Sequence, residues 1–157
     1  VIIRRDLLER SSDELPGYLN FKSHSAANSM YNTPPTFAIY IMDLVCKWII
    51  NEYGGLDSLA KTNREKAELL YSVIDRHAGF YSCHAQTASR SNMNVVFRLP
   101  SDELTAAFIE QAADHSLASL AGHRSVGGIR ASIYNAMPRA GVEALARFMD
   151  DFASTNG

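Results

Sequence analysis

The 157-residue sequence has few cysteines, little excess charge and no long hydrophobic run, and each of these absences excludes a class of protein. Its two cysteines, Cys46 and Cys83, fit neither a disulfide framework nor a zinc-binding pair, so we expect both to be reduced thiols. A formal net charge of -2 gives no overall positive field for nucleic acid or an anionic membrane. No window reaches the apolar length of a membrane span, and no signal-peptide pattern opens the sequence. These absences favour a cytoplasmic protein that binds neither nucleic acid nor membrane.

Lysine is also scarce, and the histidines outside the glycine-rich stretch described below are scattered. Three of the four lysines, Lys47, Lys61 and Lys66, lie in helical patterns, where a solvent-exposed position is expected. The fourth, Lys22, lies in a loop. The scattered histidines include no pair four residues apart beside a glutamate: His24, His77, His84 and His115. We therefore assign no catalytic role to these lysines and predict no metal site.

The residues that are present have the balance of an ordinary globular domain, with 46% hydrophobic and 20% charged side chains. Apolar residues at three- and four-residue steps predict a heavily buried helix over 37–53 and further helices over 56–77, over 102–116 and from Pro138 onward. Alternation predicts strands over 93–99 and 129–133, and shorter strands are expected over 1–4 and 117–120. Tyr18 to Tyr31 shows no clear period and is expected to be irregular. These elements predict an α/β or α+β fold, with a small sheet packed against several helices.

The stretch from Gly122 to Asn135 concentrates basic residues and glycines between runs that otherwise indicate core. It holds His123, Arg124 and Arg130 together with three glycines. Glycine lets backbone amides approach a ligand closely, and each guanidinium can bind a carboxylate or phosphate through two hydrogen bonds. Because the two arginines are six residues apart, the pattern predicts a site for a substrate with two separate negative groups.

Residue types alone leave other interpretations open for this stretch. Arg130 is equally compatible with a structural arginine paired with a surface carboxylate. His123 alone is typical of a hydrogen-bonded structural histidine, and Arg124 of a solvated side chain. Gly127 and Gly128 are compatible with a tight turn that needs no ligand beside it.

Three separated motifs carry a resemblance to a known family. They are Ser29-Met30-Tyr31-Asn32-Thr33-Pro34-Pro35-Thr36, Arg90-Ser91-Asn92-Met93-Asn94-Val95 and the run from His123 to Pro138, HRSVGGIRASIYNAMP. In this order the sequence resembles the phosphoserine aminotransferase family, pyridoxal-phosphate enzymes of serine biosynthesis with a class-V-like, fold type I architecture. The resemblance covers essentially all 157 residues but less than half of such an enzyme. It implies the end of the cofactor domain followed by the small C-terminal domain.

The resemblance also implies a division of the chain. Residues 1–31 correspond to the end of the large cofactor domain and an irregular connection, 32–54 to a proline-led turn and a long linking helix, and 55–157 to the small α/β domain. The sequence starts at Val1 in a strand-like run without an initiator methionine, so we expect it to begin within a fold.

The family's site residues map onto identical residues here. Asn32 and Thr33 resemble the pair that reaches across a homodimer interface to the cofactor phosphate of the other subunit. On local chemistry alone, the same two residues before two prolines are typical of a turn and a helix cap. His123 and Arg124 resemble the pair that holds the substrate phosphate. Arg130 resembles the arginine that binds the substrate α-carboxylate.

The resemblance implies amino-group transfer between O-phosphoserine and 2-oxoglutarate, giving 3-phosphohydroxypyruvate and glutamate, with pyridoxal 5'-phosphate as cofactor. The family's Schiff-base lysine lies just upstream of the strand that corresponds to Val1–Arg4, so no catalytic residue is expected in this chain. Two alternatives stay open. One is a non-catalytic anion-binding or dimerisation module, and the other is a related aminotransferase with a different acidic substrate.

Overall fold

The structure is a computed structural model that describes residues 1–157. The chain divides into two compact units, Val1–Trp48 and Ile49–Gly157. No helix in either unit is long and apolar enough to cross a membrane.

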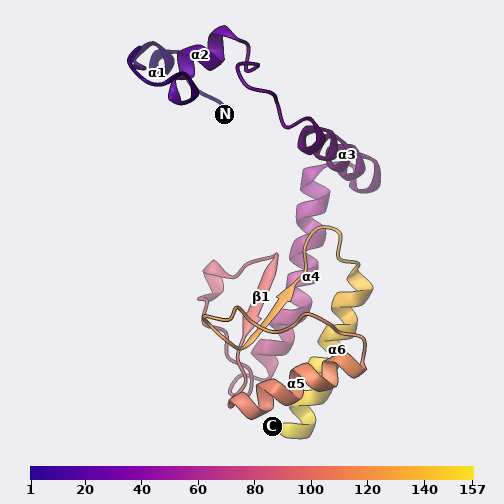
Figure 1. The fold of residues 1–157 in the computed structure, drawn as a ribbon. Coiled ribbons are helices and arrows are strands. Elements are labelled where there is room, and N and C mark those ends of the chain that lie inside the picture. The colour runs from indigo at the N-terminus through magenta and orange to yellow at the C-terminus, as the bar shows by residue number, and fades with distance from the viewer. The chain divides into compact units, whose positions relative to one another are not determined.

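The first unit is built from short helices and the start of a long one (Figure 1). Its elements are α1 (Arg5–Glu9), the 3₁₀ turn η1 (Gly17–Leu19), α2 (Phe21–Ala26) and α3 (Thr36–Tyr53), whose last residues belong to the second unit. The predicted strand over 1–4 is wrong, because these residues form no strand and the side chain of Val1 is fully exposed. Its apolar run has no neighbouring strand in this chain with which to pair.

The expectation of irregular structure from Tyr18 to Tyr31 is also wrong over part of its length, since α2 lies within it and η1 overlaps its start. The buried side chain of Asn20 caps α2 by accepting a hydrogen bond from the Lys22 N–H at 2.9 Å. The Asn20 amide also donates to the carbonyl of Ser12. A six-residue helix is too short to show a clear period in the sequence, so only its cap could have revealed it.

The long helix α3 is confirmed, and it ends at Tyr53 just before Gly54 and Gly55, which both have positive φ. The predicted heavy burial of this helix is wrong, because none of its residues is buried within the chain. Phe37, for example, is 76% exposed. A periodic apolar pattern identifies which side chains avoid water, but it does not say which chain covers them.

The second unit packs helices against a small sheet (Figure 1). Its elements are α4 (Leu56–Arg76), the 3₁₀ turn η2 (Thr87–Ser89), β1 (Asn94–Phe97), α5 (Asp102–Asp114), β2 (Ile129–Ser132) and α6 (Arg139–Asn156). The two strands pair antiparallel, with Val96 opposite Arg130. The prediction of a small sheet packed against several helices is therefore confirmed.

The predicted strand over 117–120 is wrong. Ser116 and Ser119 both have a φ of 61°, a left-handed conformation that interrupts an extended run. Pairing is limited to an isolated bridge between Ala121 and Ile129, together with a hydrogen bond from the Arg130 N–H to the Leu120 carbonyl at 2.8 Å. The segment therefore follows the edge of β2 without forming a strand.

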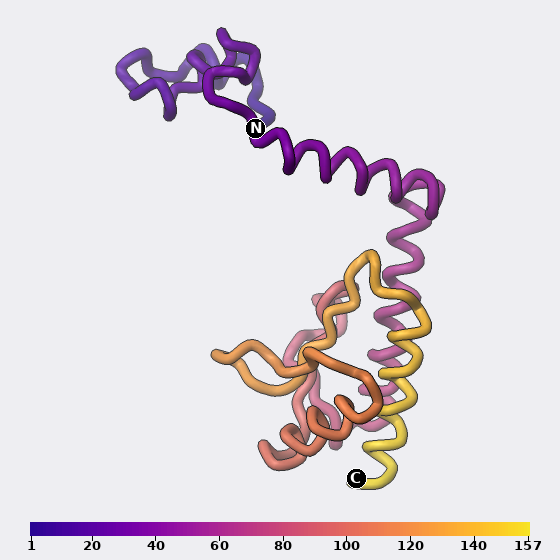
Figure 2. The backbone as a smooth tube through the Cα atoms, turned by 45° about the vertical axis from the view of Figure 1, so that its right-hand side comes forward, coloured from indigo at the N-terminus to yellow at the C-terminus, as the bar shows by residue number.

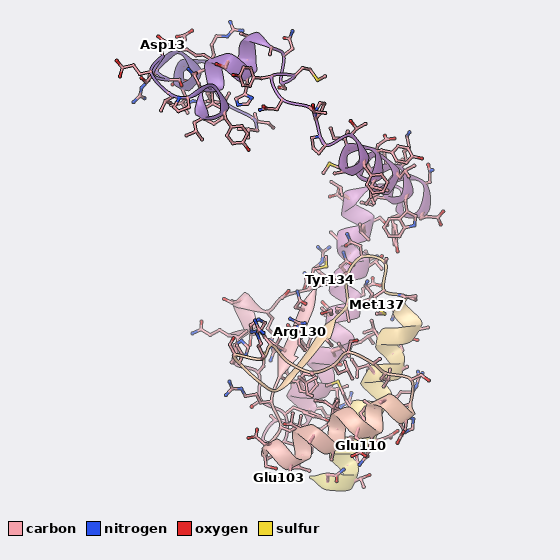
Figure 3. All side chains as sticks on the ribbon, viewed as in Figure 1. Asp13, Glu103, Glu110, Arg130, Tyr134 and Met137 are labelled. Atoms are coloured by element: carbon pink, nitrogen blue, oxygen red, sulfur yellow. The ribbon has the colours of Figure 1, made fainter.

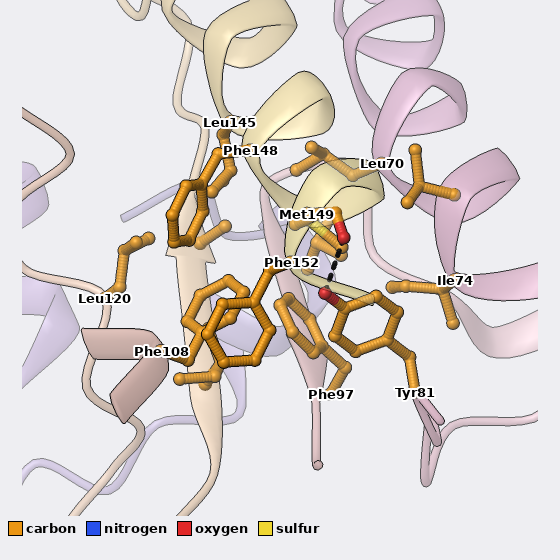
Figure 4. Packing of buried hydrophobic residues seen from close by; sticks show 14 of the residues in the cluster. Leu70, Ile74, Tyr81, Phe97, Phe108, Leu120, Leu145, Phe148, Met149 and Phe152 are labelled. Atoms are coloured by element: carbon orange, nitrogen blue, oxygen red, sulfur yellow. Dashed lines mark hydrogen bonds between the residues drawn. The ribbon is translucent and has the colours of Figure 1, made fainter. Parts of the chain in front are cut away.

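The core of the second unit lies between one face of the sheet and the helices, where α4 and α6 lie side by side (Figure 1, Figure 2). Aromatic rings meet edge to face at its centre, as between Phe97 and Phe108, whose centroids are 5.8 Å apart (Figure 4). The buried hydroxyl of Tyr81 donates to the Met149 carbonyl at 2.7 Å. Alternate strand residues point into this core, namely Val95, Phe97, Ile129 and Ala131. The opposite face of the sheet therefore carries Val96 and Arg130.

The expectation that Lys66 is exposed is wrong, since this residue of α4 is only 1% exposed. Its Nζ donates to the carbonyls of Ile133, Tyr134 and Met137 at 3.3, 2.8 and 3.1 Å. The ammonium group can be buried because carbonyl oxygens take the place of water around it.

Candidate anion-binding site

A tight turn leads into β2 and carries the predicted binding residues. The N–H groups of Val126 and Gly127 both donate to the His123 carbonyl at 2.8 Å. The turn is closed at its base, where the Gly122 N–H donates to the Gly128 carbonyl at 2.8 Å. The main chain of the turn is thus fixed by its own hydrogen bonds before any ligand is considered.

The last two glycines of the turn are required by its backbone. Gly127 and Gly128 have φ values of 73° and 69°, a region that residues with a Cβ rarely adopt. A Cβ on Gly128 would also lie 2.7 Å from the carbonyl oxygen of Phe97, whereas one on Gly127 would meet nothing within 4 Å. The tight-turn interpretation of these glycines is therefore correct, and it leaves the side chains beside them available for binding.

His123 forms one set of local contacts and retains one free ring nitrogen. Its Nδ1 lies 2.7 Å from the Ser125 hydroxyl and accepts a hydrogen bond from the Ser125 N–H at 3.3 Å. Because Nδ1 acts as an acceptor, a neutral imidazole carries its proton on Nε2. The exposed ring can therefore donate a hydrogen bond to an anion through Nε2.

The two arginines of the stretch have no carboxylate partner, unlike Arg4, Arg76, Arg90 and Arg139. Arg90 pairs with Asp75, for example, whereas Arg124 and Arg130 form no ion pair within residues 1–157. Arg130 is half-buried, and its Nε is buried without a hydrogen-bond partner. The alternative of an Arg130 paired with a surface carboxylate does not occur, and this guanidinium keeps its donors for a ligand.

A cavity of about 170 Å³ lies beside the turn, and its lining includes Val96 and Arg130 from the face of the sheet away from the core. The structure brings His123 and Arg130 together in its lining, whereas Arg124 does not line it. Two basic residues that the sequence-based reasoning missed, His84 and Arg98, also line the cavity, and no acidic residue does. Arg98 could have been found from the alternation of the strand. Asn94, Val96 and Arg98 alternate with buried residues, so they lie on the same face of the sheet as Arg130. His84 has no comparable signal, because it lies in a loop.

Asn32 and Thr33 belong to the first unit, and both are exposed just before Pro34 and Pro35. Neither side chain forms a hydrogen bond within the chain, so the alternative of a side-chain cap on α3 is not realised. Asn32 lines a cavity of about 530 Å³ within the first unit. An amide and a hydroxyl with free donors suit a phosphate group.

Comparison with known proteins identifies the family. Residues 1–145 match the family described as aminotransferase class-V. The chain belongs to this family. The resemblance found in the sequence is therefore confirmed.

The relatives within the family are consistently of one kind. The chain is 61% identical over 156 residues to a phosphoserine aminotransferase of Rhodopirellula baltica, an alignment that covers 99% of this chain and 42% of that protein. It is 53% identical to the phosphoserine aminotransferase of Geobacillus kaustophilus, covering 97% of this chain and 42% of that protein. The chain thus spans about two fifths of the length of these family members.

Solved structures agree with the fold. A phosphoserine aminotransferase from Bacillus circulans subsp. alkalophilus matches with a TM-score of 0.87 and 46% identity over 99% of this chain and 43% of that one. A phosphoserine aminotransferase from Trichomonas vaginalis with bound pyridoxal phosphate matches with a TM-score of 0.80 and 39% identity, covering 94% of this chain and 42% of that one. The predicted α/β part of an aminotransferase of this family is confirmed.

Proposed function

We propose that this chain is the C-terminal part of a phosphoserine aminotransferase, which transfers an amino group between O-phosphoserine and 2-oxoglutarate and yields 3-phosphohydroxypyruvate and glutamate. The observation that carries the proposal is the unpaired guanidinium of Arg130, which lines a cavity together with His123 and has a buried Nε without a partner. Such a group beside other basic side chains is suited to a carboxylate or phosphate. Below, the full-length enzyme means the complete protein that contains this chain together with the part corresponding to the remaining length of its relatives.

The three basic residues divide the work of binding. Arg130 lies on β2, whose pairing with β1 holds its backbone, and we assign it the α-carboxylate next to the reacting carbon. His123 and Arg124 lie on the turn, and we assign them the phosphate of phosphoserine. Glutamate also has two negative groups, so the same residues can serve both half-reactions. Holding both ends of the substrate fixes the amino group relative to the reacting centre.

The cofactor proposal rests on the chemistry of two residues. Asn32 and Thr33 have free side-chain donors at a turn made rigid by two prolines, and we propose that they hold the phosphate of pyridoxal 5'-phosphate in the other subunit of a homodimer. When bound, this cofactor supplies the electron sink for the substrate's α-carbon. We assign no catalytic residue within this chain, and Lys66, the buried lysine, already donates to three carbonyls. The Schiff-base lysine would belong to the part of the full-length enzyme outside this chain.

We further propose the division already inferred for the chain: 1–31 as the end of the cofactor domain, 32–54 as the linking segment and 55–157 as the small domain. The enzyme would act in the cytoplasm.

The test is an assay of the full-length enzyme with pyridoxal phosphate, phosphoserine and 2-oxoglutarate. We expect glutamate to form in amounts equal to the phosphoserine consumed, and we expect unphosphorylated serine at the same concentration to give far less. Absence of phosphoserine-dependent glutamate formation would refute the proposal. Equal rates with serine would favour a related aminotransferase with another substrate.

One observation supports a second candidate, a binding module that acts without catalysis. The basic cavity is formed entirely by residues of the second unit, so its basic lining is complete within this chain. Isothermal titration of the 157-residue chain with phosphoserine tests this candidate. Binding without turnover in the chain, combined with an inactive full-length protein, would establish it.

A further inference from the structure

Lys66 is a buried cation without a carboxylate partner. It lies on the core side of α4 with 1% of its surface exposed, and it takes part in none of the ion pairs of the chain. Its three N–H donors are matched by three main-chain carbonyls, those of Ile133, Tyr134 and Met137. Burial of the charge lowers the pKa of Lys66, which is an energetic cost that a methionine of similar volume would avoid. What Lys66 has and a methionine lacks is the set of three N–H donors to these carbonyls.

The three carbonyls belong to the segment that follows β2. The Ile133 N–H donates to the Met93 carbonyl at 2.9 Å, which extends the pairing of β1 and β2 by one residue. A turn follows at once, closed by the Met137 N–H donating to the Tyr134 carbonyl at 2.9 Å. Lys66 thus binds the last residue that pairs with the neighbouring strand and both ends of the turn.

A second residue of α4 holds the same segment. The amide of Asn63, which lies one turn of α4 before Lys66, donates to Asn135 Oδ1 at 2.8 Å. Residues three apart on a helix lie on one face, so Asn63 and Lys66 contact the segment from the same side. The helix α4 is itself fixed in the core by Leu70 and Ile74. The segment is therefore attached to a rigid support at several points.

This segment is continuous with the anion site. Ile129, Ala131 and Ile133 point into the core, so Arg130 and Tyr134 belong to the opposite, outward side. Figure 3 labels Arg130, Tyr134 and Met137 along this path. The Ile133 carbonyl lies three residues beyond Arg130, so the carbonyls held by Lys66 and the Arg130 side chain belong to one continuous stretch of main chain.

We propose that Lys66 is a positioning residue for substrate binding: through the carbonyls of Ile133, Tyr134 and Met137 it fixes the end of β2 and thereby the direction of the Arg130 guanidinium. This inference rests on the proposed function, because it takes Arg130 to bind the substrate carboxylate. Lys66 itself touches no substrate. Its effect is on the geometry of binding, where a displacement of about 1 Å is enough to weaken an interaction severely.

The test uses three variants of the full-length enzyme. Lys66→Met keeps the volume but removes the donors, Lys66→Arg keeps a charged donor, and Lys61→Met is the matched control, an α4 lysine whose side chain is 73% exposed. We expect Lys66→Met to raise the KM for phosphoserine about 10-fold with a smaller change in kcat, Lys66→Arg to lie between it and the parent, and Lys61→Met to match the parent. A lower melting temperature with a KM within about twofold of the parent would mean a merely structural role and would overturn the proposal.

Chemical rescue covers the case in which Lys66→Met fails to fold. Lys66→Ala, prepared in the presence of propylammonium, regains the missing three carbons and the ammonium group. Tetramethylammonium at the same concentration is the control, since it has the charge but no N–H donor. We expect only propylammonium to restore the KM. Equal rescue by both ions, or by neither, would contradict the proposed contacts.

A measurement without substrate separates this inference from the proposed function. Hydrogen exchange of the main-chain amides from Arg130 to Met137 should be faster in Lys66→Met than in Lys61→Met. If the parent enzyme fails to turn over phosphoserine while this difference is seen, the proposed function fails and the positioning contact stands. If exchange over this segment is the same in both variants, the inference fails whatever the substrate is.

Discussion

Arg98 donates a hydrogen bond from Nη2 to the Val126 carbonyl at 3.0 Å, and this bond joins the chain just after β1 to the turn that carries His123 and Arg124. The backbone of Arg98 is held by an isolated antiparallel bridge to Ser82: its N–H donates to the Ser82 carbonyl at 2.8 Å and its carbonyl accepts from the Ser82 N–H at 3.0 Å. The backbone of Arg98 is thus fixed by Ser82, and its side chain fixes the position of the turn through Val126. The position of the binding residues therefore depends on β1 as well as on the turn itself.

Replacing Arg98 should weaken binding more than it weakens the fold. In Arg98→Met we expect the affinity for phosphoserine, measured by isothermal titration, to fall about threefold to tenfold, the value of one typical hydrogen bond. The melting temperature should change little because Arg98 is exposed. Arg64→Met, at an exposed arginine of α4 outside the site, is the control and should leave affinity unchanged. Equal losses of affinity in Arg98→Met and Arg64→Met would show that the effect comes from the removal of one positive charge and not from the bond to Val126.

The two glycines at the end of the turn should respond differently to alanine. Both have positive φ, so each substitution should cost about 1 kcal/mol in the free energy of unfolding. Gly128→Ala should cost a further ~1–3 kcal/mol, because its Cβ would press on the Phe97 carbonyl, whereas the Cβ of Gly127→Ala has open space. Urea unfolding of the two variants measures the difference. Equal costs would mean that the strand and the turn are less closely packed than described.

Tyr81 should make the fold sensitive to alkali. Burial, with a smaller contribution from the charge of Asp150, raises the pKa of Tyr81 well above its ordinary value of 10.0. Because the folded protein favours the protonated phenol, this contribution to stability is complete below pH 10 and is lost as pH rises above 10. Tyr81→Phe should lose about 1 kcal/mol at pH 7, the value of the hydrogen bond to Met149.

The parent and Tyr81→Phe should differ in how steeply the free energy of unfolding falls with pH above pH 10. The parent should lose stability more steeply than Tyr81→Phe, as measured by chemical unfolding at pH 8 to 12. Tyr71, whose pKa is also raised by burial, is present in both proteins and cancels in the comparison. Parallel curves would contradict the assignment to Tyr81.

Much of the second unit could be predicted from the sequence because its signals are local. The apolar stripe of α4 includes Leu59, Leu70 and Ile74, all buried. Ser101 caps α5 by accepting from the Leu104 N–H, and serine is a residue type favoured at a helix N-cap. The candidate site was also accessible, because its basic residues and glycines are contiguous and the glycines are required by the turn.

The rest depended on contacts that no local pattern contains. The apolar residues of α3 and of the first four positions indicated burial, but the chain provides nothing that buries them. Lys66 was assigned to solvent by residue type, although it follows Asn63 by three residues and precedes Leu70 by four, which places it on the buried stripe. The carbonyls that accept its donors lie some seventy residues further along the chain. Arg98 was likewise visible only as a polar residue of an alternating strand until the turn was placed beside it.

The central claim is that one part of the site holds a phosphate and another holds a carboxylate, and a comparison of two variants tests it most directly. The measurement is kcat/KM of the full-length enzyme for phosphoserine and for serine in Arg124→Gln and Arg130→Gln. We expect Arg124→Gln to lower the value for phosphoserine by about 10-fold or more and to leave serine nearly unchanged, whereas Arg130→Gln lowers both. If Arg124→Gln affects the two substrates equally, or Arg130→Gln affects neither, the assignment of the phosphate and carboxylate is wrong.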